Sequence, residues 1–219
     1  MGRQHKHTRW KGKESKLMKT EDALNIIGGS LSKPSKMPGW SIGLPAKECK
    51  TGSKLRKVKG STCYDCYALK GMYNFPVVKQ AMMRRYEAIN HPEWVFAMSV
   101  LINSKKSKYF RWHDSGDIQS IEHLKNIFEV CRATPNTIHW LPTREAQILK
   151  QVDEKDVPDN LVIRLSAIKV DGSAPKSWNL TSTVSTKKYT CMANKQGGKC
   201  LDCRACWNKK IKNIIYPLH

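Results

Sequence analysis

The middle of the chain alternates between two spacings of apolar residues. In some segments apolar positions recur every three or four residues, as on one face of an amphipathic helix, while others are short runs rich in aromatic or β-branched residues, as in buried strands. The spacing predicts helices at residues 76–89, 94–102, 121–131 and 146–152, and strands at 108–117, 137–145 and 161–170.

Strands and helices that alternate in this way form parallel sheets with crossover helices. The sequence therefore predicts an α/β fold, either a partial parallel barrel or an open parallel sheet with crossover helices and cysteine-rich loops. One more strand is expected at 181–185, inside a Ser/Thr-rich segment. Residues 1–20 lack an apolar period and predict a basic flexible arm, which leaves 21–219 as a single α/β domain.

Charge narrows the choice of partner. The chain has 39 Lys and Arg against 18 Asp and Glu, a net charge of +21. The excess lies toward the ends: residues 187–219 hold 8 basic groups and 1 acidic group, whereas 71–186 hold 15 and 12. Such a distribution favours nucleic acid or another polyanion as partner. No apolar run is long enough to cross a bilayer, so we expect a cytoplasmic protein without a membrane partner, in the host cytosol if it is viral. The oligomeric state is unknown from the sequence.

Cysteines give the strongest chemical signal. Cys131 falls on the apolar face of a predicted helix and is interpreted as a core residue. The other seven form two groups, one near each basic end: Cys49, Cys63 and Cys66, and then Cys191, Cys200, Cys203 and Cys206. A cytosolic chain with a sizeable core does not depend on disulfides, so metal binding is the better explanation for both groups.

The second group has the C-x2-C-x2-C spacing by which bacterial ferredoxins hold an iron–sulfur cubane, with a more distant cysteine as fourth ligand. Zinc more often takes two separated C-x2-C pairs. The spacing therefore favours a [4Fe–4S] cluster on Cys200, Cys203 and Cys206, with Cys191 as the nearest fourth ligand. Zinc remains the alternative.

The first group has three cysteines and leaves three possibilities open. It holds a second cluster with an open iron, supplies a ligand to the first cluster, or binds zinc with help from a histidine. Radical S-adenosylmethionine enzymes bind their cosubstrate at a three-cysteine cluster within an α/β barrel. The C-x13-C-x2-C spacing here differs from their C-x3-C-x2-C loop.

Several motifs, taken in order, carry a family resemblance: STCYDCYALKGMY, RWHDSGDIQS, WLPTRE, and the CxxCxxCW tail followed by IIYPLH. The chain resembles the phage gene product eighty-eight family, which overlaps with proteins described as conserved iron–sulfur viral proteins. The resemblance spans most of the chain from about Cys49 onward. It implies a bacteriophage-encoded α/β protein with a bound iron–sulfur cluster and no assigned reaction.

Polar side chains lie at the carboxyl ends of two predicted strands. His113, Asp114 and Asp117 lie at the end of the first, and Arg144 lies at the end of the second. Because parallel strands gather their carboxyl ends at one edge, these residues are candidate catalytic groups. His113 would move protons, Asp114 would orient it, and Arg144 would hold an anion. The structural alternative makes Asp117 or Ser120 a helix cap and the Ser-Gly pair a turn.

Three function classes follow. The first is a nucleic-acid-associated iron–sulfur protein, in which Lys54, Arg56, Lys57 and Lys59 contact phosphates. The second is a radical-S-adenosylmethionine-like or other cluster-dependent enzyme with its site at the strand ends. The third is a zinc-stabilised structural module.

Overall fold

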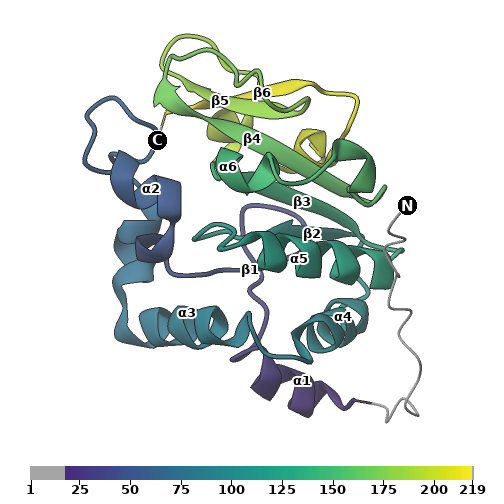
Figure 1. The fold of residues 1–219 in the computed structure, drawn as a ribbon. Coiled ribbons are helices and arrows are strands. Elements are labelled where there is room, and N and C mark those ends of the chain that lie inside the picture. Colours follow the sequence, from purple (N-terminus) through teal and green to yellow (C-terminus); the bar gives the residue numbers. More distant parts are fainter. Residues whose placement is uncertain (1–17, 219) are drawn as a thin grey trace, which may run out of the picture.

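The computed structural model describes residues 18–218 and contains a six-stranded, fully parallel sheet (Figure 1). Each strand pairs with the next one along the chain, so the order is β1-β2-β3-β4-β5-β6. This confirms the α/β class and the open parallel sheet. The strands are β1 (Trp40–Ile42), β2 (Tyr109–Trp112), β3 (Ile138–Thr143), β4 (Leu161–Val170), β5 (Thr181–Ser185) and β6 (Asn213–Pro217), and the α-helices are α1 (Thr20–Ile26), α2 (Lys50–Leu55), α3 (Pro76–Ala88), α4 (Trp94–Ser104), α5 (Ile121–Ala133) and α6 (Ala146–Leu149).

One face of the sheet carries the main hydrophobic core. Phe110 and Trp112 of β2 point to this face and pack with fully buried residues of α4 and α5, such as Met98 and Leu124. Cys131 of α5 is also fully buried here, as expected for a core cysteine. Alternate residues of a strand point to opposite faces, so Tyr109 and its neighbours at even spacing lie on the other side.

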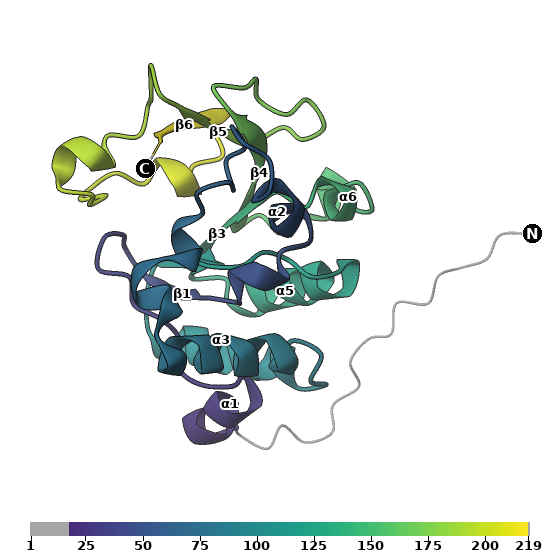
Figure 2. The same ribbon diagram turned by 90° about the vertical axis from the view of Figure 1, so that its left-hand side faces the viewer.

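The opposite face is covered by the connection between β5 and β6. Figure 2 shows this segment on one side of the sheet, with α5 and α6 on the other. Register pairs Arg111 with Trp140, and Pro142 with Arg164, which places these side chains in rows on the covered face. The two cysteine groups lie in different connections: the first follows β1 and the second follows β5.

Most predicted elements are confirmed, including the strand at 181–185. Two strands were missed. β1 has only three residues and lies between Pro38 and Pro45, and β6 lies within the basic segment 187–219. The predicted arm falls almost wholly on residues 1–17, outside the described part of the chain, and α1 already begins at Thr20. None of the helices between residues 18 and 218 has the length and apolar character needed to cross a bilayer.

Candidate metal centre

The first cysteine group lies at the carboxyl edge of the sheet. Cys49 precedes α2 directly, and Cys63 and Cys66 lie in the turn before the short 3-10 helix η2 (Tyr67–Leu69). The three thiols are close enough for Cys66 and Cys63 to raise the pKa of Cys49, after the larger effect of its burial. A Cβ atom on Gly52 would lie 3.7 Å from the sulfurs of both Cys49 and Cys63, so the missing side chain leaves space beside them.

Residues after β3 hold this cysteine loop in place. The carboxylate of Glu145, which is buried, accepts hydrogen bonds from the Thr51 backbone N–H (2.8 Å) and hydroxyl (2.7 Å), near the N-terminus of α2. The Nε of Arg144 donates to the Thr62 hydroxyl (2.9 Å), one residue before Cys63. Burial raises the pKa of the Cys63 thiol, and the positive charge of Arg144 lowers it. The Arg144 side chain therefore lies beside the first cysteine group.

Asp117 is a buried carboxylate that accepts three hydrogen bonds from its neighbours. It accepts from the Thr143 hydroxyl (2.6 Å) and from the backbone N–H groups of Arg144 (2.9 Å) and Ile118 (2.8 Å). Burial raises its pKa to about 6, even though these hydrogen bonds lower it. Ser120, not Asp117, caps α5, through a bond from the His123 N–H. Asp117 thus ties the end of β2 to the end of β3.

His113 and Asp114 do not form the expected pair. The His113 ring is buried, and neither nitrogen makes a hydrogen bond of normal geometry, although the Ile42 carbonyl lies beside it. The Asp114 carboxylate instead accepts from Tyr73 (3.4 Å), and its backbone carbonyl accepts from Tyr67 (2.5 Å). Burial and nearby His123 lower the pKa of His113 well below its usual value, so the ring is neutral at pH 7. The prediction that Asp114 orients His113 is wrong, because the aspartate turns toward the cysteine loop.

The chain turns sharply to make this arrangement possible. His113 has φ +60° and Gly116 has φ +80°, both left-handed. A Cβ on Gly116 would lie 2.6 Å from the Cβ of Leu44, so only glycine fits against the residue that follows β1. The turn expected from the Ser-Gly pair is therefore present.

The second cysteine group crosses the covered face of the sheet. The Cys191 N–H donates to the Ile215 carbonyl of β6 (3.0 Å), and the Cys200 N–H donates to the Lys36 carbonyl, ahead of β1 (2.8 Å). The Cys206 sulfur lies 3.1 Å from the Tyr216 hydroxyl. Cys191 and Cys203 both raise the pKa of Cys200, after the larger effect of burial, so the sulfurs lie near one another. The four cysteines therefore lie in one neighbourhood of the chain, but within residues 18–218 they are not yet arranged as a metal-holding group.

Arg164 and Trp207 fasten this segment to the sheet. Arg164 is fully buried and donates to the carbonyls of Cys206 (3.1 Å), Asn208 (2.9 Å) and Ile211 (2.9 Å), with further bonds to Ala205 and Thr181. The Trp207 indole donates to the Phe110 carbonyl (3.0 Å). These side chains replace the backbone pairing that an irregular segment on a sheet face would otherwise lack.

Arg111 is a further residue of this region, one not predicted from the sequence. Its guanidinium lies over the Trp140 ring (4.8 Å to the ring centre), and its terminal nitrogens contact the Tyr67 hydroxyl (3.2 Å) and the Met37 sulfur (3.5 Å). Tyr67 follows Cys66, and Met37 follows the residue that binds Cys200. Arg111 therefore links the surroundings of both cysteine groups. An arginine within an aromatic strand was the only signal.

The chemistry of the donor set suits an iron–sulfur cluster in each group. All eight cysteines are free thiols, so no disulfide competes for them. Burial raises the pKa of Cys206 to about 11, while Tyr216 and Arg111 lower it. Within residues 18–218, no three His, Cys, Asp or Glu side chains already have the geometry to hold a metal ion. Binding of an iron–sulfur cluster, or of zinc, by the two cysteine groups is therefore a proposal.

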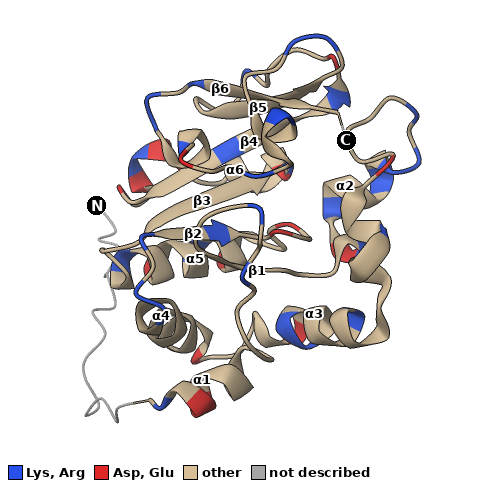
Figure 3. Cartoon of the chain, turned by 180° about the vertical axis from the view of Figure 1, so that it is seen from behind, with Lys and Arg blue, Asp and Glu red and all other residues tan. Residues whose placement is uncertain are grey.

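The predicted phosphate-contacting residues lie next to the first cysteine group. Lys54 is in α2, and Arg56, Lys57 and Lys59 follow it, before Cys63. All but Arg56 are exposed. Figure 3 shows this basic loop projecting beside α2, away from the sheet. The residues form no ion pair within the described part of the chain.

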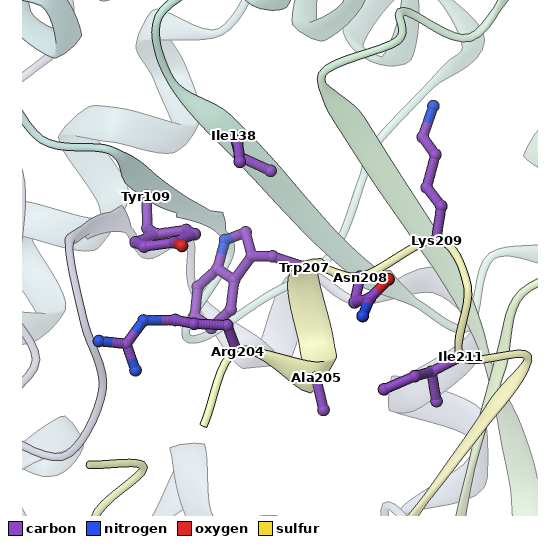
Figure 4. Close-up of a pocket in the computed structure, with 8 residues that line it drawn as sticks. All are labelled: Tyr109, Ile138, Arg204, Ala205, Trp207, Asn208, Lys209 and Ile211. Atoms are coloured by element: carbon purple, nitrogen blue, oxygen red, sulfur yellow. The ribbon is translucent and has the colours of Figure 1, made fainter. Parts of the chain in front are cut away.

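A separate pocket lies at the opposite, amino edge of the sheet (Figure 4). It has a volume of about 390 Å³ and is lined by Tyr109, Ile138, Arg204, Ala205, Trp207, Asn208, Lys209 and Ile211. Arg204 covers the Tyr109 ring, 5.3 Å from its centre. This hollow is distinct from the strand-end residues, which lie at the carboxyl edge.

The family model described as gene product 88 matches residues 6–182. The chain belongs to the gene product 88 family. The match includes the first cysteine group, the turn after β2 and Arg144, and it ends before Cys191. The gene product 88 resemblance that the motifs indicated is therefore confirmed at the level of the family. No curated protein and no solved structure matches the chain.

Proposed function

We propose that this member of the gene product 88 family is a phage iron–sulfur enzyme that acts at the carboxyl edge of its sheet. In this proposal Cys191, Cys200, Cys203 and Cys206 hold a [4Fe–4S] cluster with no open position. Cys49, Cys63 and Cys66 hold a second cluster with one iron open to a ligand. The observation that carries the proposal is the gathering of three thiols where parallel α/β sheets place their sites.

The surroundings of the first group support an open site. Three cysteines leave one iron of a cubane without a protein thiolate, and Gly52 keeps side-chain atoms away from two of the sulfurs. Arg144 provides a positive charge beside Cys63, and Glu145 fixes the helix that follows Cys49. When bound, such a cluster would supply electrons to a ligand such as S-adenosylmethionine at its open iron.

Polar residues of the strand ends have supporting roles in this proposal. Asp117 holds the strand ends through its hydrogen bonds with Thr143 and Arg144, and Glu145 holds the cysteine loop through those with Thr51. His113 is neutral and buried behind them. Arg144 remains the candidate to hold an anionic group, since its guanidinium reaches the cysteine loop from the end of β3.

Anaerobic purification with iron and sulfide analysis tests the proposal. We expect about eight iron atoms per wild-type chain, as two [4Fe–4S] clusters require. Cys63→Ser and Cys206→Ser are each expected to remove about half of the iron, and Cys131→Ser none. The reduced wild type should cleave S-adenosylmethionine, and Cys63→Ser should not. Stoichiometric zinc in a colourless protein would overturn the proposal.

A second candidate, association with nucleic acid, is favoured by the loop between Cys49 and Cys63. Lys54, Arg56, Lys57 and Lys59 present four positive charges next to the proposed open cluster. Binding through phosphates weakens steeply with salt. Replacing the four by Gln should reduce both affinity and its salt dependence, whereas Lys187→Gln with Lys188→Gln should change them little. Equal affinity of both variants would exclude this loop as the contact.

A further inference from the structure

Two guanidinium groups lie on the sheet face that the second cysteine group covers. Arg164 is fully buried. Arg111 is half-buried, and its Nε is buried without a hydrogen-bond partner. A charge removed from water costs free energy unless an opposite charge or several polar groups compensate it. Backbone carbonyls bond the Arg164 guanidinium, so its hydrogen bonds are satisfied, but its positive charge and that of Arg111 still favour an anion nearby.

No carboxylate balances either charge through an ion pair. The ion pairs within residues 18–218 are Lys70 with Asp65, Arg132 with Glu129, and Lys155 with Asp153, all on the surface. Arg164 bonds only to backbone carbonyls. Asp114 is near enough to Arg111 to raise its pKa, against the effect of burial, but does not pair with it.

Both arginines are instead connected to the cysteines of the second group. Arg164 donates directly to the carbonyl of Cys206. Arg111 contacts the sulfur of Met37. The carbonyl of Lys36, the residue before Met37, accepts the hydrogen bond of the Cys200 N–H. The positive charge of Arg111 acts on Cys200, Cys206 and Tyr216, which agrees with this placement.

We propose that Arg111 and Arg164 are the counter-charges of an anionic cluster on Cys191, Cys200, Cys203 and Cys206, and that Arg111 raises its reduction potential. Four thiolates give an iron–sulfur cluster a net negative charge, and reduction adds another. A nearby cation in a region of low dielectric favours the reduced form. This inference rests on the cluster proposed above and assigns these arginines as positioning and charge-compensating residues.

A redox titration of the full-length, iron-loaded protein tests the inference. The signal to follow is the one that Cys206→Ser abolishes. Arg111→Gln is expected to lower the equilibrium constant for reduction at least about tenfold, which is about 59 mV for one electron. Lys199→Gln is the matched control, because Lys199 precedes Cys200 but is exposed to solvent. Its removal should shift the constant less than about threefold, owing to screening by water and salt.

Arg111→Lys separates charge from shape. It keeps the positive charge while losing the planar stack on Trp140, so the potential should remain near that of the wild type. A tenfold shift in this variant overturns the inference even if Arg111→Gln fails to fold. An iron-loaded Arg111→Gln protein with unchanged potential also overturns it and leaves the proposed function standing. A wild-type chain that binds no iron overturns both.

Discussion

Arg164 and Cys206 are joined by a hydrogen bond of 3.1 Å from the arginine Nε to the cysteine carbonyl oxygen. The bond connects the middle of β4 to the last cysteine of the second group, 42 residues further along the chain. Because Arg164 also holds the carbonyls of Asn208 and Ile211, one side chain determines the path of the segment from Cys206 to β6. The Arg164 side chain thus donates the hydrogen bonds that a neighbouring strand would otherwise donate to these carbonyls.

Replacing this arginine should loosen the segment. Arg164→Lys keeps the charge but has three donors on one nitrogen, so it cannot bond all five carbonyls that the guanidinium now reaches, and each buried carbonyl left unpaired costs about 1–3 kcal/mol. We expect the free energy of unfolding to fall by about 3 kcal/mol or more in urea titrations, with faster hydrogen exchange at residues 205–211. Arg132→Lys is the control, since Arg132 also bonds a carbonyl, of Asp156, but at the surface. Equal losses in the two variants would contradict this role.

Gly52→Ala should separate stability from metal loading. Gly52 lies within α2, where alanine is favoured over glycine by about 1 kcal/mol. The new methyl group would lie 3.0 Å from the Cβ of Cys49 and next to two sulfurs. We expect little change in thermal stability, because the close contact with Cys49 offsets the helix preference, together with loss of about half of the bound iron. Ser53→Ala, one position further on, should retain the iron. Full iron content in Gly52→Ala would show that the space beside the sulfurs is not used.

The helical and strand pattern predicted the fold well because its elements bury regular faces. The helix at 121–131 and the strand at 161–170 have enough apolar positions to be recognised from spacing alone. β1 was not predicted because three residues are too few to show a period. β6 was not predicted because its neighbours in the sequence are basic and polar. Both strands are stabilised by long-range pairing, with β2 and β5, which local sequence does not reveal.

The candidate site was predicted in its thiols but not in its supporting residues. Cysteine spacing separated Cys131 from the other seven, and the structure places Cys131 in the core. The polar residues at the strand ends were predicted to be catalytic. The Asp117 carboxylate, however, accepts hydrogen bonds from the Thr143 hydroxyl and the Arg144 N–H, which hold the strand ends together. Glu145 ends a predicted strand, but neither its role nor that of Arg111 could be predicted, since their partners Thr51 and Tyr67 are 94 and 44 residues away in the chain.

Glu145→Gln tests the support of the first cysteine group. A glutamine has an NH2 group in place of one carboxylate oxygen and no negative charge, so the Thr51 N–H and hydroxyl no longer both donate to a charged acceptor as they do now. Because hydrogen bonds to a charged group contribute about 1.5–3 kcal/mol, we expect stability to fall by about 2 kcal/mol and iron at the first group to be partly lost. Thr51→Ser keeps the hydroxyl and should behave like the wild type. Full stability and full iron content in Glu145→Gln would show that the hydrogen bonds from Thr51 to Glu145 do not hold the first cysteine group in place.

Buried histidines should make the fold sensitive to acid. Burial lowers the pKa values of His123 and His139 to about 3. Between pH 6.5 and 3 the unfolded chain therefore binds protons that the folded chain does not, so stability falls as pH is lowered through this window. Asp117 opposes the trend, because its pKa of about 6 makes the folded state bind a proton more tightly than the unfolded chain does.

His123→Asn isolates one of these contributions. Asparagine keeps an acceptor for the Gln119 N–H, which His123 now accepts through Nδ1, but it does not titrate. Between pH 6 and 4 the free energy of unfolding of the variant should depend on pH less steeply than that of the wild type, by about 1.4 kcal/mol per pH unit. Urea titrations at several pH values measure this slope. A slope in His123→Asn parallel to that of the wild type would contradict the prediction, because it would mean that His123 takes up its proton at the same pH in the folded and the unfolded chain.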